Sequence, residues 1–254
     1  YDRPGSIYLD ETGNDWHDNH LRFGTLCRVA TDIARDGASG WRPQVIHAHD
    51  WQAGLIPLLI ELEDLPRPAA TIITVHNVAF QGLFPWQEKE TFAIPDEHFT
   101  HEGAEYWGHL GFLKSGLSYA DAITTVSPTY ARELLTPEFG MGLDGVFQNR
   151  EDDLSGIING IDLDTWNPKT DPHLARNYTS RSLGRKAINR AALADRFKLA
   201  ESDGPLFCVI SRLTEQKGLD VLLEALPALV EQRGQLALLG SGDPGLEDAF
   251  RNAA

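Results

Sequence analysis

The sequence has little cysteine and no long hydrophobic run. Cys27 and Cys208 are the only two cysteines in 254 residues, and their spacing fits neither a metal-binding nor a redox motif, so we expect a reducing compartment. No apolar run reaches the ~18 residues of a membrane span, and no signal peptide is visible. The sequence therefore favours a cytoplasmic protein over a membrane protein.

Positive charge is also scarce. The chain has 22 Lys and Arg against 37 Asp and Glu, which gives a formal net charge of −15. Such an acidic surface repels the nucleic-acid backbone and anionic lipids, so neither is an expected partner. Any anionic ligand must be held by a few local cations. The hydrophobic fraction of 42% is sufficient for a buried core.

Short apolar runs alternate with helix-like segments along most of the chain. The runs are PQVIHAHD, AATIITVHN, AITTVS, GPLFCVIS and QLALLG. Ser127 and Pro128 are predicted to cap and begin a helix, HLGFLKSGLSYAD is predicted to be an amphipathic helix, and Pro227 is expected to kink or split the helix over LDVLLEALPALVEQ. The alternation indicates an α/β fold with parallel sheets.

The alternation stops between Glu151 and Asp203. The segment GIINGIDLDTWNPKTDP is rich in Gly, Asn, Asp and Pro, which is typical of a linker. We place a domain boundary near Ile161, which predicts units over 1–160 and 161–254. Only two strand–helix pairs follow the boundary, so the second unit is expected to be incomplete.

Candidate binding residues close the apolar runs, because ligands of open α/β sheets bind beyond the carboxyl ends of the strands. These candidates are His47, His49, Asp50, His76, Asn77, Ser127, Arg212, Lys217, Gly240, Ser241, Gly242 and Asp243.

His47 and His49 alternate with Ala48, so both should point to one side of a strand. They could hydrogen-bond a polar substrate, bind a metal, or serve only as packing groups. No third ligand has metal-site spacing, although His76 could complete a trio in space. Metal binding is the weaker hypothesis.

Arg212 and Lys217 follow an apolar run and precede a predicted helix. A guanidinium can bind two phosphate oxygens, and a lysine and a helix N-terminus add further attraction for an anion. The pair therefore fits a diphosphate clamp, but on spacing alone two ordinary cations of a solvated loop are the more common explanation. The nearby LLGSGDPG is neither a dinucleotide-binding nor a Walker motif.

Six segments occur in the order found in bacterial glycogen synthases: HAHDWQAGL, TVHNVAFQGLF, FLKSGLSYADAITTVSPTYARELLTPEFGMGLDGVF, GIINGIDLDTWNP, SRLTEQKGLDVLLEALP and QLALLGSGDP. The chain closely resembles these enzymes and the plastid starch synthases over essentially its whole length. The resemblance implies a GT-B fold, in which two Rossmann-like domains with parallel sheets face each other across a cleft. It assigns 1–160 to most of the N-terminal domain and 161–254 to the hinge and the start of the nucleotide-sugar-binding domain.

The resemblance also implies an activity. These enzymes transfer glucose from ADP-glucose to the non-reducing end of an α-1,4-glucan with retention, and the resemblance implies no cofactor or metal. Arg212 and Lys217 match the pair that binds the ADP diphosphate and stabilises its developing charge. His49 matches the cleft histidine that reaches the transferred glucose, and Asn159 matches a donor-sugar or cleft contact.

Two family motifs do not occur in this sequence. The upstream K-x-G-G-L is missing, and KSGL at Lys114 is a helix segment in another place. The downstream E-x7-E is also missing; Glu97 and Glu105 have its spacing by chance, since they precede the hinge. We therefore expect the chain to be an internal fragment that is inactive alone.

Other functions stay open at this point. A related GT-B enzyme that uses UDP-glucose, such as a sucrose or trehalose-phosphate synthase, would keep the cleft histidine and the cation pair. A sugar-nucleotide epimerase would share the fold. A non-catalytic glucan-binding module would use aromatic residues expected at the surface, such as Trp86, Phe92 and Trp107, although core or loop packing explains each of them equally well. The sequence does not distinguish glycogen from starch as the product, and a starch synthase would place the protein in a plastid.

Overall fold

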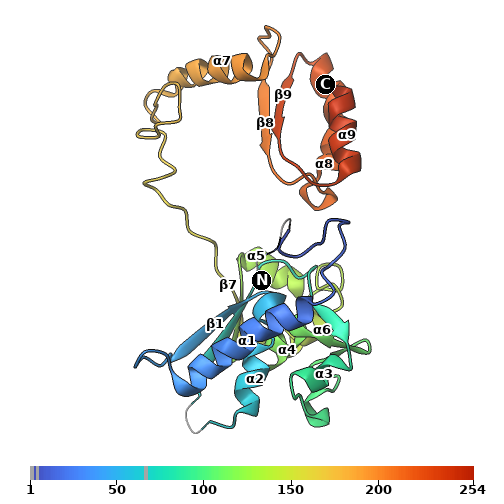
Figure 1. Cartoon of the computed structure of the whole chain (residues 1–254). Coiled ribbons are helices and arrows are strands. Elements are labelled where there is room, and N and C mark those ends of the chain that lie inside the picture. Colours follow the sequence, from blue (N-terminus) through green and yellow to red (C-terminus); the bar gives the residue numbers. More distant parts are fainter. Residues whose placement is uncertain (1–2, 4–5, 66–67) are drawn as a thin grey trace. The chain divides into compact units, whose positions relative to one another are not determined.

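The computed structural model describes Arg3 and residues 6–65 and 68–254. The chain forms two compact units, Tyr1–Gly160 and Ile161–Ala254 (Figure 1). Between Ile157 and Ser182 the chain forms turns and coil, with no helix or strand. None of the helices in the described ranges has the length and apolar character needed to cross a bilayer.

The first unit is built on a parallel sheet with the strand order β1-β2-β6-β7. Its strands are β1 (Val45–His49), β2 (Ala70–Val75), β6 (Ala122–Thr125) and β7 (Leu154–Gly156). Ile73 and Ile123, which pair across β2 and β6, are fully buried. The carboxyl ends of the strands lie along one edge, because every pairing is parallel. The α/β class expected from the sequence is confirmed.

The helices of the first unit are α1 (Asn19–Asp36), α2 (Ile56–Leu62), α3 (Glu88–Thr91), α4 (Phe112–Tyr119), α5 (Pro128–Leu134) and α6 (Asp144–Asn149), with 3₁₀ turns at Trp51–Ala53, Asp96–His98 and Glu151–Asp153. Two glycines allow α4 to lie close to its neighbours. A Cβ on Gly116 would be 2.2 Å from Cδ1 of Ile73, and one on Gly54 would be 2.2 Å from the Phe112 carbonyl oxygen. The start of α5 agrees with the sequence, since the Ser127 hydroxyl accepts hydrogen bonds from two backbone N–H groups of its first turn.

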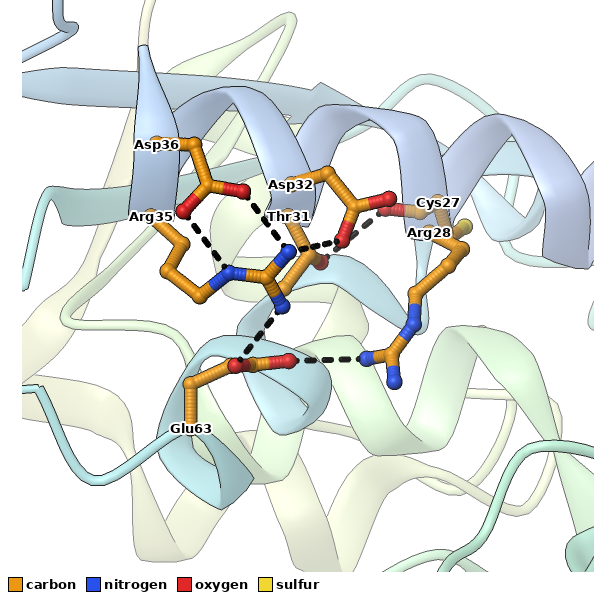
Figure 2. Close-up of polar contacts among 7 residues, drawn as sticks. All are labelled: Cys27, Arg28, Thr31, Asp32, Arg35, Asp36 and Glu63. Carbon is orange, nitrogen blue, oxygen red and sulfur yellow. Dashed lines mark hydrogen bonds and ion pairs between the residues drawn. The ribbon is translucent and has the colours of Figure 1, made fainter.

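An ion-pair network joins α1 to the end of α2 (Figure 2). Glu63, which caps α2, accepts from Arg28 at 2.9 Å and from Arg35 at 3.1 Å. Arg35 also pairs with Asp32 and Asp36 on its own helix. The network holds the two helices together beside the buried Cys27. Burial raises the pKa of that thiol to about 12, so it stays protonated.

A small antiparallel sheet with the order β3-β5-β4 lies beside α4. It consists of β3 (Leu83–Pro85), β4 (Glu105–Tyr106) and β5 (His109–Gly111). The helix predicted from His109 therefore begins only at Phe112, because the preceding residues pair with β3 and β4 instead. Phe92 is not the exposed aromatic that the sequence suggested, since its ring packs against Phe112 at a centroid distance of 5.6 Å.

The second unit contains the two-stranded parallel sheet β8-β9 and three helices. Its elements are α7 (Lys186–Phe197), β8 (Leu206–Ile210), α8 (Leu219–Glu231), β9 (Gln235–Leu239) and α9 (Pro244–Ala253), with 3₁₀ turns at Leu183–Arg185 and Glu215–Lys217. Leu213, Leu219 and Phe250 form its small core. The helix predicted to kink or split at Pro227 is not split, because α8 runs through this residue without a break.

Candidate functional site

Three histidines meet at the carboxyl ends of β1 and β2. The rings of His47 and His49 stack with a centroid distance of 4.3 Å. His49 Nδ1 lies 3.0 Å from His76 Nε2, and His47 Nε2 lies 2.6 Å from the Thr74 hydroxyl oxygen. The alternation with Ala48 thus places both β1 histidines on one side, and His76 completes a trio in space.

The electrostatics of the trio favour a neutral His49. Burial, followed by the nearby His47 and His76, lowers the pKa of His49 below its ordinary value of 6.5. A neutral imidazole has one donor and one acceptor nitrogen, so in the 3.0 Å contact between His49 Nδ1 and His76 Nε2 one nitrogen donates and the other accepts. Within the described ranges no group of three His, Cys, Asp or Glu side chains has a geometry that could hold a metal ion.

Asp50 connects the end of β1 to the loop that follows β2. Its side-chain Oδ1 accepts hydrogen bonds from the backbone N–H groups of His76 at 2.7 Å and Asn77 at 3.4 Å. Its own N–H donates to the Thr74 carbonyl at 2.9 Å. The residue has φ 52° and ψ −168°, close to a region that is almost confined to glycine. Asp50 therefore joins the strand that carries His49 to the loop that carries His76, although its backbone is strained.

Arg212 and Lys217 lie on the loop between β8 and α8 of the second unit. Both side chains are exposed, and neither makes a hydrogen bond or ion pair within the described part of the chain. Lys217 ends the 3₁₀ turn, and Gly218, with φ 68°, leads into α8. Two uncommitted cations therefore stand at the carboxyl end of β8, next to a helix N-terminus.

The loop after β9 lies against this cation loop. Leu213 N donates to the Ser241 carbonyl at 2.9 Å, and Asp243 N donates to the Leu213 carbonyl at 2.7 Å. The contact requires glycine, because a Cβ on Gly240 would lie 1.9 Å from the Ser211 carbonyl oxygen. The structure thus brings together Arg212, Lys217 and the glycine-containing segment that the sequence singled out after QLALLG.

Asn159 lies in exposed coil after β7, at the end of the first unit. Its side chain has no hydrogen-bond partner among the described residues. His49 and Asn159 therefore belong to the first unit, whereas Arg212 and Lys217 belong to the second. The sequence made Asp50 a candidate because it closes the apolar run after His49, but it did not indicate that the carboxylate binds the backbone of the next strand's loop.

Comparison with known proteins extends this picture. The family model for the starch synthase catalytic domain matches residues 1–149. The chain belongs to this family. A glycogen synthase from Roseobacter denitrificans is 55% identical over the whole chain, and glycogen synthase 1 from Rhizobium meliloti is 50% identical over the whole chain. The resemblance to bacterial glycogen synthases is therefore confirmed.

A solved member of the family shows the same fold. The catalytic domain of starch synthase IV from Arabidopsis thaliana, bound to ADP and acarbose, matches 94% of this chain with a TM-score of 0.84 and 31% identity. The GT-B class expected from the sequence is confirmed. The chain spans about half the length of its relatives, with 53% of each of the two glycogen synthases and 50% of the starch synthase structure covered.

Proposed function

We propose that the protein containing this chain is a retaining glucosyltransferase that moves glucose from ADP-glucose to the non-reducing end of an α-1,4-glucan. The observation that carries the proposal is the free cation pair Arg212 and Lys217 at the carboxyl end of β8, in a chain that is 50–55% identical to several glycogen synthases along its whole length.

The cation pair would act on the leaving group. As the bond between the glucose C1 and the diphosphate oxygen breaks, negative charge grows on the diphosphate, and two preorganised cations stabilise that charge. The acceptor hydroxyl oxygen forms its bond to C1 on the same face, which retains the configuration. Its proton passes to the departing diphosphate, so the step needs no enzyme nucleophile.

The residues of the first unit would hold the sugar. A neutral His49 can donate or accept one hydrogen bond to a hydroxyl group of the transferred glucose, and His76 holds its ring. Asn159 would contact the donor sugar or line the cleft. Loss of His49 should therefore lower turnover more than donor affinity.

ADP-glucose is the proposed donor, and glycogen is the proposed acceptor. The starch synthase IV structure contains ADP, which is the product that ADP-glucose leaves after transfer. The similar glycogen synthases are bacterial, which supports a place in the bacterial cytoplasm.

The test is kinetic and uses the full-length protein with glycogen primer. Arg212→Ala and Lys217→Ala should each raise the barrier by about 2.5–4 kcal/mol, on the order of a hundred- to thousandfold in rate, by analogy with the loss of one oxyanion donor. The double variant should fall short of the sum, because both residues serve one charge. Arg196→Ala is the matched control, since Arg196 is an exposed cation on α7 without a hydrogen bond or ion pair in the described structure.

Parallel assays with ADP-glucose and UDP-glucose test the identity of the donor separately from the role of the cation pair in the transfer step. Faster transfer from UDP-glucose would show that UDP-glucose is the donor, while the proposed role of Arg212 and Lys217 would stand. Near-normal turnover of both single variants, with the fold intact, would mean that the two cations are ordinary surface charges.

A further inference from the structure

A cavity of about 590 Å³ opens in the first unit between the β4–β5 hairpin, α4 and α6. Its volume lies within the ~300–1,000 Å³ that is usual for small-molecule sites. None of the residues that line it belongs to the histidine trio or to the cation loop. Those that determine its chemistry are Glu102, Glu105, Trp107, Lys114, Asn149 and Arg150.

Trp107 is held at the mouth of this cavity in a strained conformation. Trp107 and Gly108 form the two-residue connection of the hairpin, with φ 50° and φ 77°. Positive φ at both positions is the pattern of a type I′ turn, in which Asn, Asp or Gly is favoured at the first position. A bulky residue with positive φ is an outlier, and Trp107 is nevertheless 82% exposed. The fold therefore accepts a local cost to present an aromatic ring to solvent.

The surrounding contacts keep the turn in place. The Glu105 carboxylate accepts from Gly108 N at 2.6 Å. The Tyr106 hydroxyl donates to the Met141 carbonyl at 3.1 Å, and its ring lies edge-on to the indole of Trp107. The contacts of Glu105 and Tyr106 thus hold the backbone and the ring of Trp107 in place.

The cations of the cavity are already used by the protein. Lys114, only 3% exposed, donates to the carbonyls of His101 and Glu105. Arg150 donates to three carbonyls at the end of α4 and to Asp153. With Glu102 and Glu105 the charges of the lining balance, so the cavity favours neither a phosphate nor a cationic ligand.

A neutral ligand with an apolar face and many hydroxyl groups suits these features. The apolar face of a sugar ring can stack on Trp107, and the Glu102 carboxylate and the Asn149 amide can hydrogen-bond its hydroxyl groups. We propose that this cavity is a saccharide-binding site that holds a stretch of glucan away from the residues of the transfer reaction. The inference rests on the proposed function only for the choice of an α-1,4-glucan.

Trp107→Asn in the full-length protein provides a sharp test. Asn is favoured at this turn position, so the melting temperature should stay the same or rise. The dissociation constant for maltoheptaose, measured by calorimetry without donor, should rise by about tenfold, as for the loss of an aromatic anchor. Trp41→Ala is the matched control and should not change binding, since Trp41 is 62% exposed in the same unit but does not line the cavity.

A second pair of variants keeps the same backbone strain. Trp107→Phe retains a ring and should bind maltoheptaose within about threefold of the parent, whereas Trp107→Leu should lose about tenfold. Equal affinities of these two variants, or unchanged affinity of Trp107→Asn, would overturn the proposed site. Absence of transfer from ADP-glucose, with Trp107-dependent binding intact, would reject the proposed function and leave the saccharide site standing.

Discussion

The strained backbone of Asp50 allows its two roles to be measured separately. Asp50→Ala removes the acceptor for His76 N–H and keeps a non-glycine residue at φ 52°. Asp50→Gly removes the same acceptor but relieves the strain. Asp50→Asn keeps an acceptor oxygen and removes the charge. Comparison of the Ala and Gly variants therefore isolates the contribution of backbone strain to the free energy of unfolding.

The structure fixes the expected magnitudes. A hydrogen bond to a charged group contributes ~1.5–3 kcal/mol, and the lower end applies here because the His76 backbone lies near the surface. Asp50→Ala should therefore lower the free energy of unfolding by about 1.5–2 kcal/mol. Strain at such a position costs ~1–3 kcal/mol, but Gly also loses more backbone entropy on folding, so Asp50→Gly should be more stable than Asp50→Ala by about 1 kcal/mol.

Urea denaturation and steady-state kinetics of the full-length variants provide the measurements. Stability should decrease in the order parent, Gly, Ala, while turnover should fall in both variants, because both lose the contact that orients His49 and His76. Asp50→Asn should retain most of the stability and most of the turnover. A Gly variant that is no more stable than the Ala variant would refute the strain argument.

Three further changes test other contacts of the first unit. Arg150→Ala removes the hydrogen bonds to three carbonyls at the end of α4 and should destabilise the protein by about 3 kcal/mol, with a smaller loss for Arg150→Lys, as urea denaturation would show. Glu63→Gln weakens the ion pairs between α1 and α2 and should cost about 0.5–1 kcal/mol at low salt and less at high salt; an effect independent of salt would contradict this. The folded-state pKa of His49 lies below 6.5, so the unfolded chain takes up the proton first. The contribution of His49 to stability should be complete above pH 6.5 and be lost as the pH falls below that value. His49→Gln should therefore flatten this part of a plot of melting temperature against pH.

Local signals in the sequence were reliable where a structure depends on neighbouring residues. The Ser127–Pro128 pair predicted the start of α5, because a cap needs only the hydroxyl and the next few N–H groups. The sequence pattern also located the candidate residues at strand ends correctly, since parallel strands place their carboxyl ends at one edge of the sheet. The sequence alone therefore predicted the α/β class and the positions of His49 and Arg212.

Features that depend on distant partners were not predictable. His109 looked like part of a helix, but it pairs with Pro85 and Tyr106 in a small sheet. The role of Asp50 depends on the backbone N–H of His76, which follows a different strand. The exposure of Trp107 suggested by the sequence is confirmed, but the hairpin that carries this residue was not predicted, because its turn residues resemble no common type I′ pair. In each case, tertiary contacts outweighed local propensity.

The coil between Ile157 and Ser182 sets the effective concentration of one unit relative to the other, on which the proposed reaction depends. His49 lies before this segment and Arg212 after it, so in the proposed reaction the segment is the covalent link between these two residues. A tether converts the meeting of two parts into an intramolecular event, with local concentrations that reach the millimolar range for short flexible linkers. A proteolytic cut within residues 158–161, which make no hydrogen bond in the described structure, would leave the hydrogen bonds of each unit in place. It would nevertheless remove this connection and make the encounter of the two units dependent on dilution.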